Sequence, residues 1–477
     1  MNAEDKNCLE GGAVRYYLAI DIGASSGRHI LAHLEDGNMV LEEVHRFPNG
    51  MTEKDGELVW DVDELSAQIV LGMKKCAEIG KIPVSVGVDT WGVDIVLLDK
   101  EGKRLGNAVA YRDSRTRGMD EEVYKIIPED ELYARTGIQK AIFNTIYQLM
   151  ALKTKKPELL ERAEILLTMP DYFHYMLSGV AVTEYTEATT GQLVSPLTKD
   201  WDRELIDRLG YPGHIFQKIV APGTRIGSLT ESVKAEVGFD CDVVVPASHD
   251  TGSAVIAVPT DRDNALYISS GTWSLMGTER MKADCSPESK ANNLTNEGGY
   301  DYRFRYLKNI MGLWMIQSVK KEIGGELGFG EICDMASRCE ISSIVDCNDD
   351  RFLAPANMTE EVQKACRESG QQVPEGIAEV ASVIYNSLAK CYARTIAELE
   401  SMTGEKYDRI HIVGGGSNAE YLNRLTARAT GVPVYAGPTE ATAIGNVAAQ
   451  MIAAGELEGL KAARACVFRS FPIRICE

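Results

Sequence analysis

The sequence predicts an α/β protein built from two similar domains that face one another across a central cleft. The segment "YYLAIDIGASSGRHILAHLE" at 16–35 indicates a strand, a Ser/Gly-rich turn and a second strand, and "NALYISSGTWSLMGTERM" at 264–281 repeats that theme. After each of these hairpins, apolar strands alternate with helical segments. We therefore expect a flexible N-terminal extension over residues 1–15, a first domain over 16–258 and a second over 259–477.

In the first half, β-branched and apolar residues predict strands on both sides of the turn at 23–27. A helix is expected from Asp61 to about 79, capped by Asp61 or Asp63, because an aspartate accepts hydrogen bonds from the free N–H groups of a first turn. A second pair of strands follows in "VSVGVDTWGVDIVLLDKEG", and a polar stretch from about 120 to 207 is expected to be rich in helices.

In the second half, a long helix is expected from about 376 to 402. The strand "RIHIVGGG", a helix over 418–430, the strand "VPVYA" and a final helix complete the pattern.

Composition and charge exclude several classes of protein. The chain has 477 residues and a net charge of −20, which disfavours binding to nucleic acid or to an anionic membrane. Its 11 cysteines include no Cys-x-x-Cys pair, which argues against a zinc site and fits a reducing compartment. The N-terminus is polar, so we expect neither a signal peptide nor an anchor there, and no apolar run is long enough to span a bilayer. We expect a cytoplasmic protein that binds small molecules.

The first candidate site is the turn that follows Asp21. An ionised carboxylate among Leu, Ala and Ile needs a partner, since leaving it buried and unpaired is unfavourable by several kcal/mol. The residues over 23–27 could cradle a phosphate with backbone N–H groups and hydroxyls, and Arg28 adds a cation. The alternative is an ordinary hairpin turn capped by an aspartate. The turn "SSGTWS" at 269–274 is a second candidate of the same kind.

Asp250 lies between a predicted buried strand at 243–245 and a small, apolar helical segment at 251–258. It could simply cap that helix. A helix N-terminus would also keep the carboxylate ionised and directed, so the same position could serve in catalysis.

The loop "VDTWGVD" combines Trp91 with Asp89 and Asp94 around Gly92. Tryptophan beside an acid can hold a sugar, whereas a packed core tryptophan with turn aspartates explains the pattern equally well. The segment "LKNIMGLWMIQ" predicts an amphipathic helix with Asn309 near its start, where asparagine is commonly a cap.

The run "IHIVGGGSNAE" fits G-x-G-x-x-A after a strand, with Glu440 roughly where a ribose-binding acid belongs, so a dinucleotide enzyme is a competing interpretation. Too little chain follows for a complete dinucleotide-binding domain. The glycines would equally let an adenosine lie flat on the backbone. No P-loop, protein-kinase or G-x-S-x-G signature is present.

Taken together, "AIDIGASSGR", "GVDTWGVDIVLLD", "AYRDSRT", "SHDTGSA", "SSGTWSLMG", "NIMGLWMIQ" and "VGGGSNAEYLNRL…GPTEATAIGN" resemble the FGGY carbohydrate kinases over about 16–454. The resemblance implies an actin-like ATPase fold, with a ribonuclease-H-like core in each domain. It also implies ATP-dependent phosphorylation of a ketose, the 1-hydroxyl of L-rhamnulose, with Mg²⁺, in a monomer or small homo-oligomer.

The resemblance assigns roles to residues at the matching motifs. Asp250 would be the catalytic base, and Asp21 would hold Mg²⁺ through water. The residues implied to bind ATP are Ala24, Ser25, Ser26, Gly27, Arg28, Thr272, Gln317 and Gly415. Those implied to bind the sugar are Gly92, His249, Asp250, Thr251 and Asn309.

Two alternatives remain open at the level of sequence. A sibling kinase for L-fuculose, xylulose or glycerol would share most of these motifs. A chaperone-like or filament-forming ATPase of the actin-like superfamily would share both phosphate hairpins but would not need the "VDTWGVD" loop.

Overall fold

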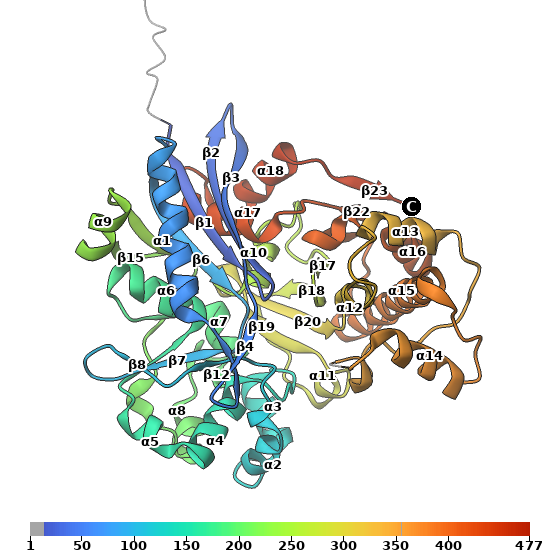
Figure 1. Cartoon of the computed structure of the whole chain (residues 1–477), viewed down its shortest axis with the longest axis horizontal. Coiled ribbons are helices and arrows are strands. Elements are labelled where there is room, and N and C mark those ends of the chain that lie inside the picture. Colours follow the sequence, from blue (N-terminus) through green and yellow to red (C-terminus); the bar gives the residue numbers. More distant parts are fainter. Residues whose placement is uncertain (1–13, 354) are drawn as a thin grey trace, which may run out of the picture.

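The computed structural model describes residues 14–353 and 355–477 and is built around two large β-sheets, one in each half of the chain (Figure 1). Most of the predicted extension, residues 1–13, lies outside the described residues. The first sheet has six strands, in the order β15 (Thr224–Ser228), β16 (Asp242–Val245), β6 (Pro83–Thr90), β1 (Tyr16–Ile22), β2 (Ser26–Glu35) and β3 (Asn38–Pro48). The second has seven strands, in the order β19 (Thr295–Gly298), β20 (Phe304–Ile310), β18 (Ser274–Arg280), β17 (Tyr267–Ser270), β21 (Ile410–Val413), β22 (Val434–Ala436) and β23 (Arg474–Cys476).

The two sheets repeat one topology. In each, a hairpin of antiparallel strands (β1–β2 and β17–β18) continues through a parallel neighbour (β6 and β21). A second parallel strand (β16 and β22) and an antiparallel edge strand (β15 and β23) follow in both. On the other side, β3 and β20 extend each hairpin. The predicted α/β architecture of two similar halves is therefore confirmed.

The alternation of side chains along β1 divides the first sheet into two faces. Leu18 and Ile20 pack against α1 (Val62–Glu78), α6 (Met169–Ser178) and α9 (Glu231–Val237). Tyr17 and Ala19 belong instead to a core that contains α10 (Asp250–Ile256), α17 (Ala441–Ala453) and α18 (Gly459–Ser470). Asp21 follows Ala19 by two positions, so it lies on this second face, which is directed toward the other sheet.

The helices α10 and α17 are packed closely in the middle of the molecule (Figure 1). A Cβ atom at Gly445 would lie 1.7 Å from the carbonyl oxygen of Ser253, so the contact between the two backbones requires glycine. The same core includes Tyr267 of β17 and Val413 of β21, so it joins the two sheets.

Additional layers surround this centre. The predicted helix-rich stretch is confirmed, and its elements are α2 (Met119–Tyr124), α3 (Glu129–Thr136), α4 (Thr145–Lys155), α5 (Pro157–Arg162), α6, α7 (Tyr185–Thr190) and α8 (Arg203–Leu209). The second sheet is covered by α12 (Trp314–Glu322), α13 (Phe329–Ser337), α14 (Met358–Glu368), α15 (Gly376–Thr403) and α16 (Glu420–Thr430).

The remaining elements are short. The strands are β4 (Met51–Lys54), β5 (Glu57–Trp60), β7 (Ile95–Leu98), β8 (Arg104–Leu105), β9 (Ala108–Val109), β10 (Ile165–Thr168), β11 (Thr183–Glu184), β12 (Val194–Ser195), β13 (Asp200–Trp201) and β14 (Ile219–Val220). The helical elements are α11 (Pro287–Ala291), η1 (Ser114–Thr116), η2 (Gly213–Ile215), η3 (Tyr300–Tyr302), η4 (Asp350–Phe352) and η5 (Gly415–Asn418). No helix of the described residues is long and apolar enough to cross a membrane.

Two local expectations from the sequence are wrong. Asn309 lies on β20, paired with Leu275 of β18, and the helix begins only at Trp314. The glycine run forms the turn η5 before α16 begins at Glu420, two residues later than expected. The expected position of Asp250 near the start of a helix is confirmed, because it is the first residue of α10 after the cap residue His249. The predicted helix after Asp61 is confirmed, because that side chain accepts the N–H of Glu64 at 3.0 Å.

Candidate active site

Three carboxylates lie at the carboxyl ends of three neighbouring parallel strands. Asp21 of β1 is directly opposite Asp89 of β6 in the sheet register. Asp250 follows β16, and the segment before it stays beside β6 through a bridge between Thr90 and His249. The Coulombic effect of Asp21 contributes to raising the pKa of both other acids, after the larger effect of burial. The sheet topology therefore brings together acids that are far apart in sequence.

Asp250 is the acid best placed to react with a ligand. Its side chain is 35% exposed, whereas Asp89 is completely buried. One oxygen, Oδ1, accepts hydrogen bonds from the backbone N–H and the hydroxyl of Thr251. Desolvation and the nearby Asp21 raise the pKa of Asp250 to about 6. These effects outweigh the helix N-terminus, which was expected to favour the ion, but the carboxylate remains ionised at pH 7.

Asp21 is paired with Arg28, as expected for a carboxylate among apolar residues. The Nε and Nη2 atoms of Arg28 donate to its Oδ2 atom at 2.9 and 2.7 Å. The Nη1 atom of the same arginine lies 2.7 Å from Glu440, which precedes α17. Arg28 is therefore not a free cation but a bridge between acids of the two halves. Glu440, which fitted a ribose-binding acid by spacing, is occupied by this ion pair.

The turn after Asp21 is held by two hydrogen bonds to the backbone of Gly23, one of them from the side chain of Asn49. The Gly23 N–H donates to Ser26 at 2.9 Å, and Asn49 donates to Gly23 at 2.8 Å. Ser25 is exposed at the tip, with Ala24 and Ser26 half-buried beside it. A Cβ atom at Gly27 would lie 2.1 Å from the Phe47 ring, so packing alone explains that glycine.

The residues expected to bind the nucleotide in the second half converge in space. The Thr272 hydroxyl donates to the Gln317 side chain at 3.4 Å, and the N–H of Trp314 donates to the Thr272 carbonyl at 2.9 Å. The turn η5 packs against the end of β17, where a Cβ atom at Gly416 would lie 1.9 Å from the Ser270 hydroxyl. Gly415 is exposed, with open space around its Cα atom.

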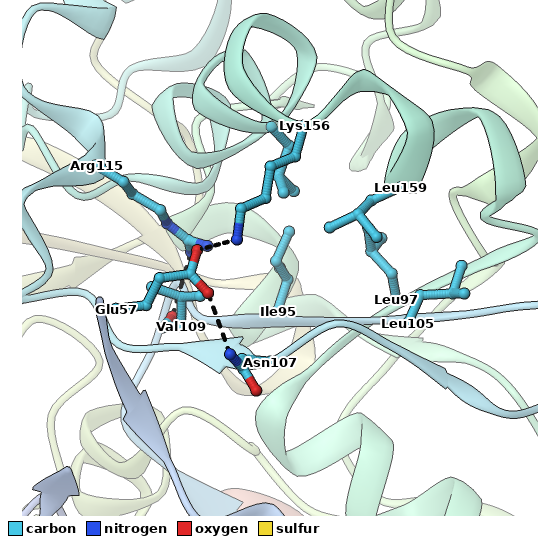
Figure 2. A pocket seen from close by; sticks show the side chains of 10 residues that line it. Glu57, Ile95, Leu97, Leu105, Asn107, Val109, Arg115, Lys156 and Leu159 are labelled. Carbon is cyan, nitrogen blue, oxygen red and sulfur yellow. Dashed lines mark hydrogen bonds and ion pairs between the residues drawn. The ribbon is translucent and has the colours of Figure 1, made fainter. Parts of the chain in front are cut away.

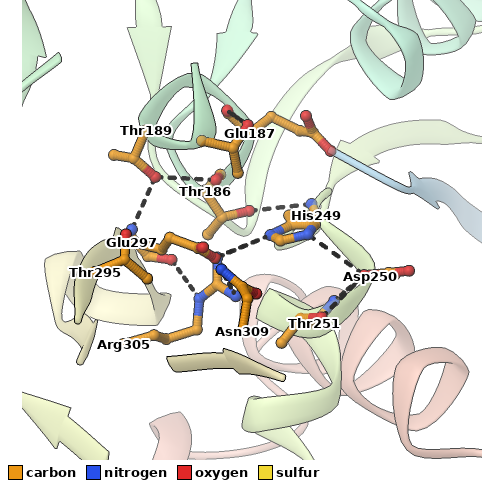
Figure 3. Close-up of polar contacts among 12 residues, drawn as sticks. Thr186, Glu187, Thr189, His249, Asp250, Thr251, Thr295, Glu297, Arg305 and Asn309 are labelled. Carbon is orange, nitrogen blue, oxygen red and sulfur yellow. Dashed lines mark hydrogen bonds and ion pairs between the residues drawn. The ribbon is translucent and has the colours of Figure 1, made fainter. Parts of the chain in front are cut away.

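His249 is the centre of a buried polar network (Figure 3). Its backbone N–H donates to Thr186 at 3.1 Å. Its Nδ1 atom lies 3.0 Å from Nη2 of Arg305 and 3.5 Å from Glu297, and its Nε2 atom lies 3.5 Å from Asp250. Burial and the Arg305 charge hold the pKa of His249 well below its usual value, so the imidazole is neutral.

The other residues expected to bind the sugar surround His249. A Cβ atom at Gly92 would lie 3.4 Å from His249 Nε2 and 3.2 Å from the Thr190 side chain, so Gly92 and His249 are neighbours. Asn309 is half-buried and lies beside Arg305 in Figure 3. Its amide donates to Gln139 at 3.3 Å. The Gly92 loop, the start of α10 and β20 therefore meet at one place.

Trp91 and Asp94 are structural. The Trp91 ring packs on Trp60 with ring centroids 4.0 Å apart, and its N–H donates to Asp94 at 2.9 Å. Asp94 also accepts hydrogen bonds from the Trp60 ring and from the backbone of Tyr111. These contacts satisfy the packed-core interpretation of the "VDTWGVD" loop rather than stacking on a sugar.

Sequence reasoning missed Arg305, Glu297 and Glu187. Arg305 and Glu297 are buried in the second sheet, and both carboxylate oxygens of Glu187 on α7 are buried without a hydrogen-bond partner. The only signal for Arg305 was a charged residue within the apolar pattern "RFRYL".

A small cavity elsewhere does not compete with this site. It lies between β7 and the helices α4 and α5, and has a volume of about 20 Å³ (Figure 2). Its walls include Arg115 and the ion pair between Glu57 and Lys156. That volume holds about one water molecule, not a sugar.

Comparison with known proteins identifies relatives along almost the whole chain. The N-terminal domain of the FGGY family of carbohydrate kinases matches residues 16–257, and its C-terminal domain matches 266–454. A rhamnulokinase of Halalkalibacterium halodurans is 48% identical over 97% of this chain and 98% of its own. A rhamnulokinase of Bacillus subtilis is 42% identical over 96% of this chain and 94% of its own.

Solved structures show the fold. A gluconate kinase from Lactobacillus acidophilus has a TM-score of 0.79 at 16% identity, over 97% of this chain and 94% of its own. A glycerol kinase from Plasmodium falciparum, solved with ADP, has a TM-score of 0.76 at 16% identity, over 96% and 94% of the two chains. The predicted two-domain, actin-like architecture is confirmed by these neighbours.

Proposed function

The chain belongs to the FGGY family of carbohydrate kinases, and from this premise we propose that it transfers the γ-phosphoryl group of ATP to the 1-hydroxyl of L-rhamnulose. The products are L-rhamnulose 1-phosphate and ADP, which places the reaction in L-rhamnose catabolism. The choice of sugar is supported by relatives at 42–48% identity that are named rhamnulokinase. The observation that carries the chemistry is the partly exposed Asp250 beside the neutral His249.

Asp250 acts as the general base in this proposal. A sugar hydroxyl is a weak nucleophile at neutral pH, and a carboxylate within hydrogen-bond reach can accept its proton as the O–P bond forms. A pKa of about 6 leaves Asp250 ionised at pH 7 while making it a stronger base than an ordinary aspartate. Its Oδ2 atom accepts no hydrogen bond from the described residues, so it is available for the hydroxyl.

The acids fit a divalent cation held mainly through water. Carboxylate oxygens are the ligands that Mg²⁺ prefers, and Mg²⁺ commonly binds one or two carboxylates together with water and phosphate oxygens. The Oδ1 atom of Asp89 is buried without a partner beside Asp21. No group of three acidic, histidine or cysteine side chains in the described residues is close enough to hold an ion directly. Mg²⁺ bound near Asp21 would neutralise charge on the phosphates.

The remaining residues divide between the two substrates. ATP would lie between the two Ser/Gly turns, in contact with Ala24, Ser25, Ser26, Gly27, Arg28, Thr272, Gln317 and Gly415. The sugar would contact Gly92, His249, Thr251 and Asn309. Residues 16–258 would supply most of the sugar site and the first phosphate-binding turn. Residues 259–477 would supply the second phosphate-binding turn and the adenosine site, with Asn309 reaching the sugar from the second half. Alignment and charge stabilisation by these groups supply most of the catalysis in phosphoryl transfer.

A coupled assay of ADP release tests this function. The panel consists of L-rhamnulose, L-fuculose, xylulose and glycerol, each with ATP and Mg²⁺. We expect the highest kcat/KM for L-rhamnulose. Higher kcat/KM for another member of the panel would identify a sibling kinase, and no stimulation of ATP consumption by any of them would contradict a carbohydrate kinase.

A further inference from the structure

Arg305 is completely buried on β20, and its guanidinium group reaches from the second sheet to the residue before α10. Its Nε atom donates to the Gly298 carbonyl at 2.7 Å, and its Nη1 atom lies 3.2 Å from Glu297. Its Nη2 atom lies 3.0 Å from Nδ1 of His249. Glu297 balances the charge of the arginine, which makes its burial tolerable.

This contact determines where the hydrogen of the imidazole lies. A guanidinium group is always protonated and carries only donors, so Nδ1 of His249 must accept. A neutral imidazole has one N–H group, and it must therefore be on Nε2. Glu297 and Asp250 lie 3.5 Å from Nδ1 and Nε2 and favour the protonated ring, but burial and the Arg305 charge outweigh them and hold the pKa of His249 well below its usual value.

The Nε2–H group faces the site at which the sugar is expected. The Asp250 Oδ1 atom is 3.5 Å away, which is too long for a strong hydrogen bond. Nε2 also faces Gly92, where a Cβ atom would lie 3.4 Å from it and 3.2 Å from the Thr190 side chain. The donor is therefore directed toward the atoms next to the hydroxyl that Asp250 would deprotonate.

We propose that Arg305, held by Glu297, is a positioning residue that fixes the tautomer of His249 so that Nε2–H donates to an oxygen of the ketose next to the reacting hydroxyl. This inference rests on the proposed function. The carbonyl oxygen at C2 is adjacent to the 1-hydroxyl and can only accept hydrogen bonds, which matches a fixed donor. Keeping the imidazole neutral also protects the basicity of Asp250, because a cation at this distance would lower the proton affinity of the carboxylate.

The tautomer is measured directly by ¹⁵N NMR of protein labelled at its seven histidines. The His249 signals are assigned by their loss in His249→Gln. We expect a neutral ring protonated at Nε2 at pH 7.5 in the wild-type protein. A ring protonated at Nδ1, or at both nitrogens, would overturn the inference whatever the enzyme phosphorylates.

Kinetics test the positioning role. Arg305→Met is expected to raise KM for the ketose at least about tenfold and to add the Nδ1-protonated form to the NMR spectrum. Arg305→Lys retains a donor and is expected to recover part of both changes; it also serves if the methionine variant does not fold. If a folded variant loses the Nε2–H tautomer and still binds the ketose with the wild-type KM, that result would contradict the positioning role of Arg305.

Arg135→Met is the matched control. Arg135 forms a bidentate pair with Asp202 at 2.8 and 2.7 Å, outside the site. Its loss is expected to lower thermal stability while leaving the ketose KM and the His249 signals unchanged. If the wild-type tautomer is as expected but no ketose is phosphorylated, the proposed function fails, and the tautomer assignment remains.

Discussion

The two halves of the molecule share one sheet topology but carry different chemistry at equivalent positions. Asp21 is the second-last residue of β1, just before the turn, whereas the second-last residue of the equivalent strand β17 is Ser269. The helix after β16 begins with Asp250, whereas the helix after β22 is preceded by Glu440. The first half thus presents an acid at the hairpin strand where the second half presents a hydroxyl, whereas both halves place an acid at the start of the helix.

The two helix-start acids are also in different electrostatic states. Glu440 is paired with Arg28 at 2.7 Å. Among the described residues, the only ion-pair contact of Asp250 is with His249, which is neutral. A duplicated architecture has therefore kept one acid neutralised by a cation and left the other available as a base.

The largest expected effect comes from exchanging each of these acids for its amide. Asp250→Asn removes the base, and we expect kcat to fall at least about 10²-fold with little change in ATP binding. Glu440→Gln, the matched variant in the other half, should change kcat far less, because it touches Arg28 rather than the substrate hydroxyl. Both variants are measured with L-rhamnulose, ATP and Mg²⁺. Equal losses in kcat would contradict the claim that Asp250, but not Glu440, acts as a base.

Asp21 is expected to give the next largest effect. Asp21→Asn keeps the shape of the side chain but removes the charge that would hold water around Mg²⁺. Loss of such an outer-shell partner typically weakens metal binding about 10- to 100-fold. Half-maximal activity should therefore need a correspondingly higher Mg²⁺ concentration. An unchanged Mg²⁺ titration would exclude Asp21 from the metal site.

Substitutions at two glycines test which residues contact the sugar and which contact the nucleotide. Gly92→Ala places a methyl group 3.4 Å from His249 Nε2, and we expect KM for the sugar to rise roughly tenfold. Gly415→Ala adds a methyl group in open space, so it should leave stability unchanged while raising KM for ATP by a smaller factor. If Gly92→Ala raised KM for ATP and Gly415→Ala raised KM for the sugar, the binding roles proposed for these two glycines would be wrong.

The smallest expected effect is on stability. Asp250 has a pKa of about 6 in the folded state, above its ordinary value of 3.8, so the folded state binds this proton more tightly than the unfolded state. The ionised carboxylate therefore destabilises the fold above pH 6 but not below pH 3.8. Asp250→Asn should raise the melting temperature at pH 8 by roughly 2 °C and leave it unchanged at low pH. An unchanged or lower value at pH 8 would contradict the raised pKa.

The sequence was most informative where local patterns determine structure. Both hairpins, the helix capped by Asp61 and the long helix α15 follow from apolar periodicity and capping. Asn309 was misplaced because the strand β20 is specified by its pairing with β18, which no local pattern reveals. The sequence does not distinguish a sugar-binding Trp91 from a packed core tryptophan, because its packing partner Trp60 is distant in sequence.

The polar network was the least predictable part of the site. Arg305 and His249 are 56 residues apart and meet only because the second sheet lies against the start of α10. The role of Arg305 can be recognised only once its ion-pair partner Glu297 and its hydrogen-bond acceptor His249 are both known. The roles assigned to the ATP-binding and sugar-binding residues remain predictions that the experiments above test.

The pH dependence of kcat/KM for L-rhamnulose tests most directly whether ionised Asp250 takes the proton from the sugar, because this parameter reports groups of the enzyme before the sugar binds. We expect kcat/KM of the wild-type enzyme to be constant above a pKa of about 6 and to fall about tenfold per pH unit below it. Asp250→Asn should give a low rate without this inflection. The same inflection in Asp250→Asn, or a rate near wild type, would show that another group is the base.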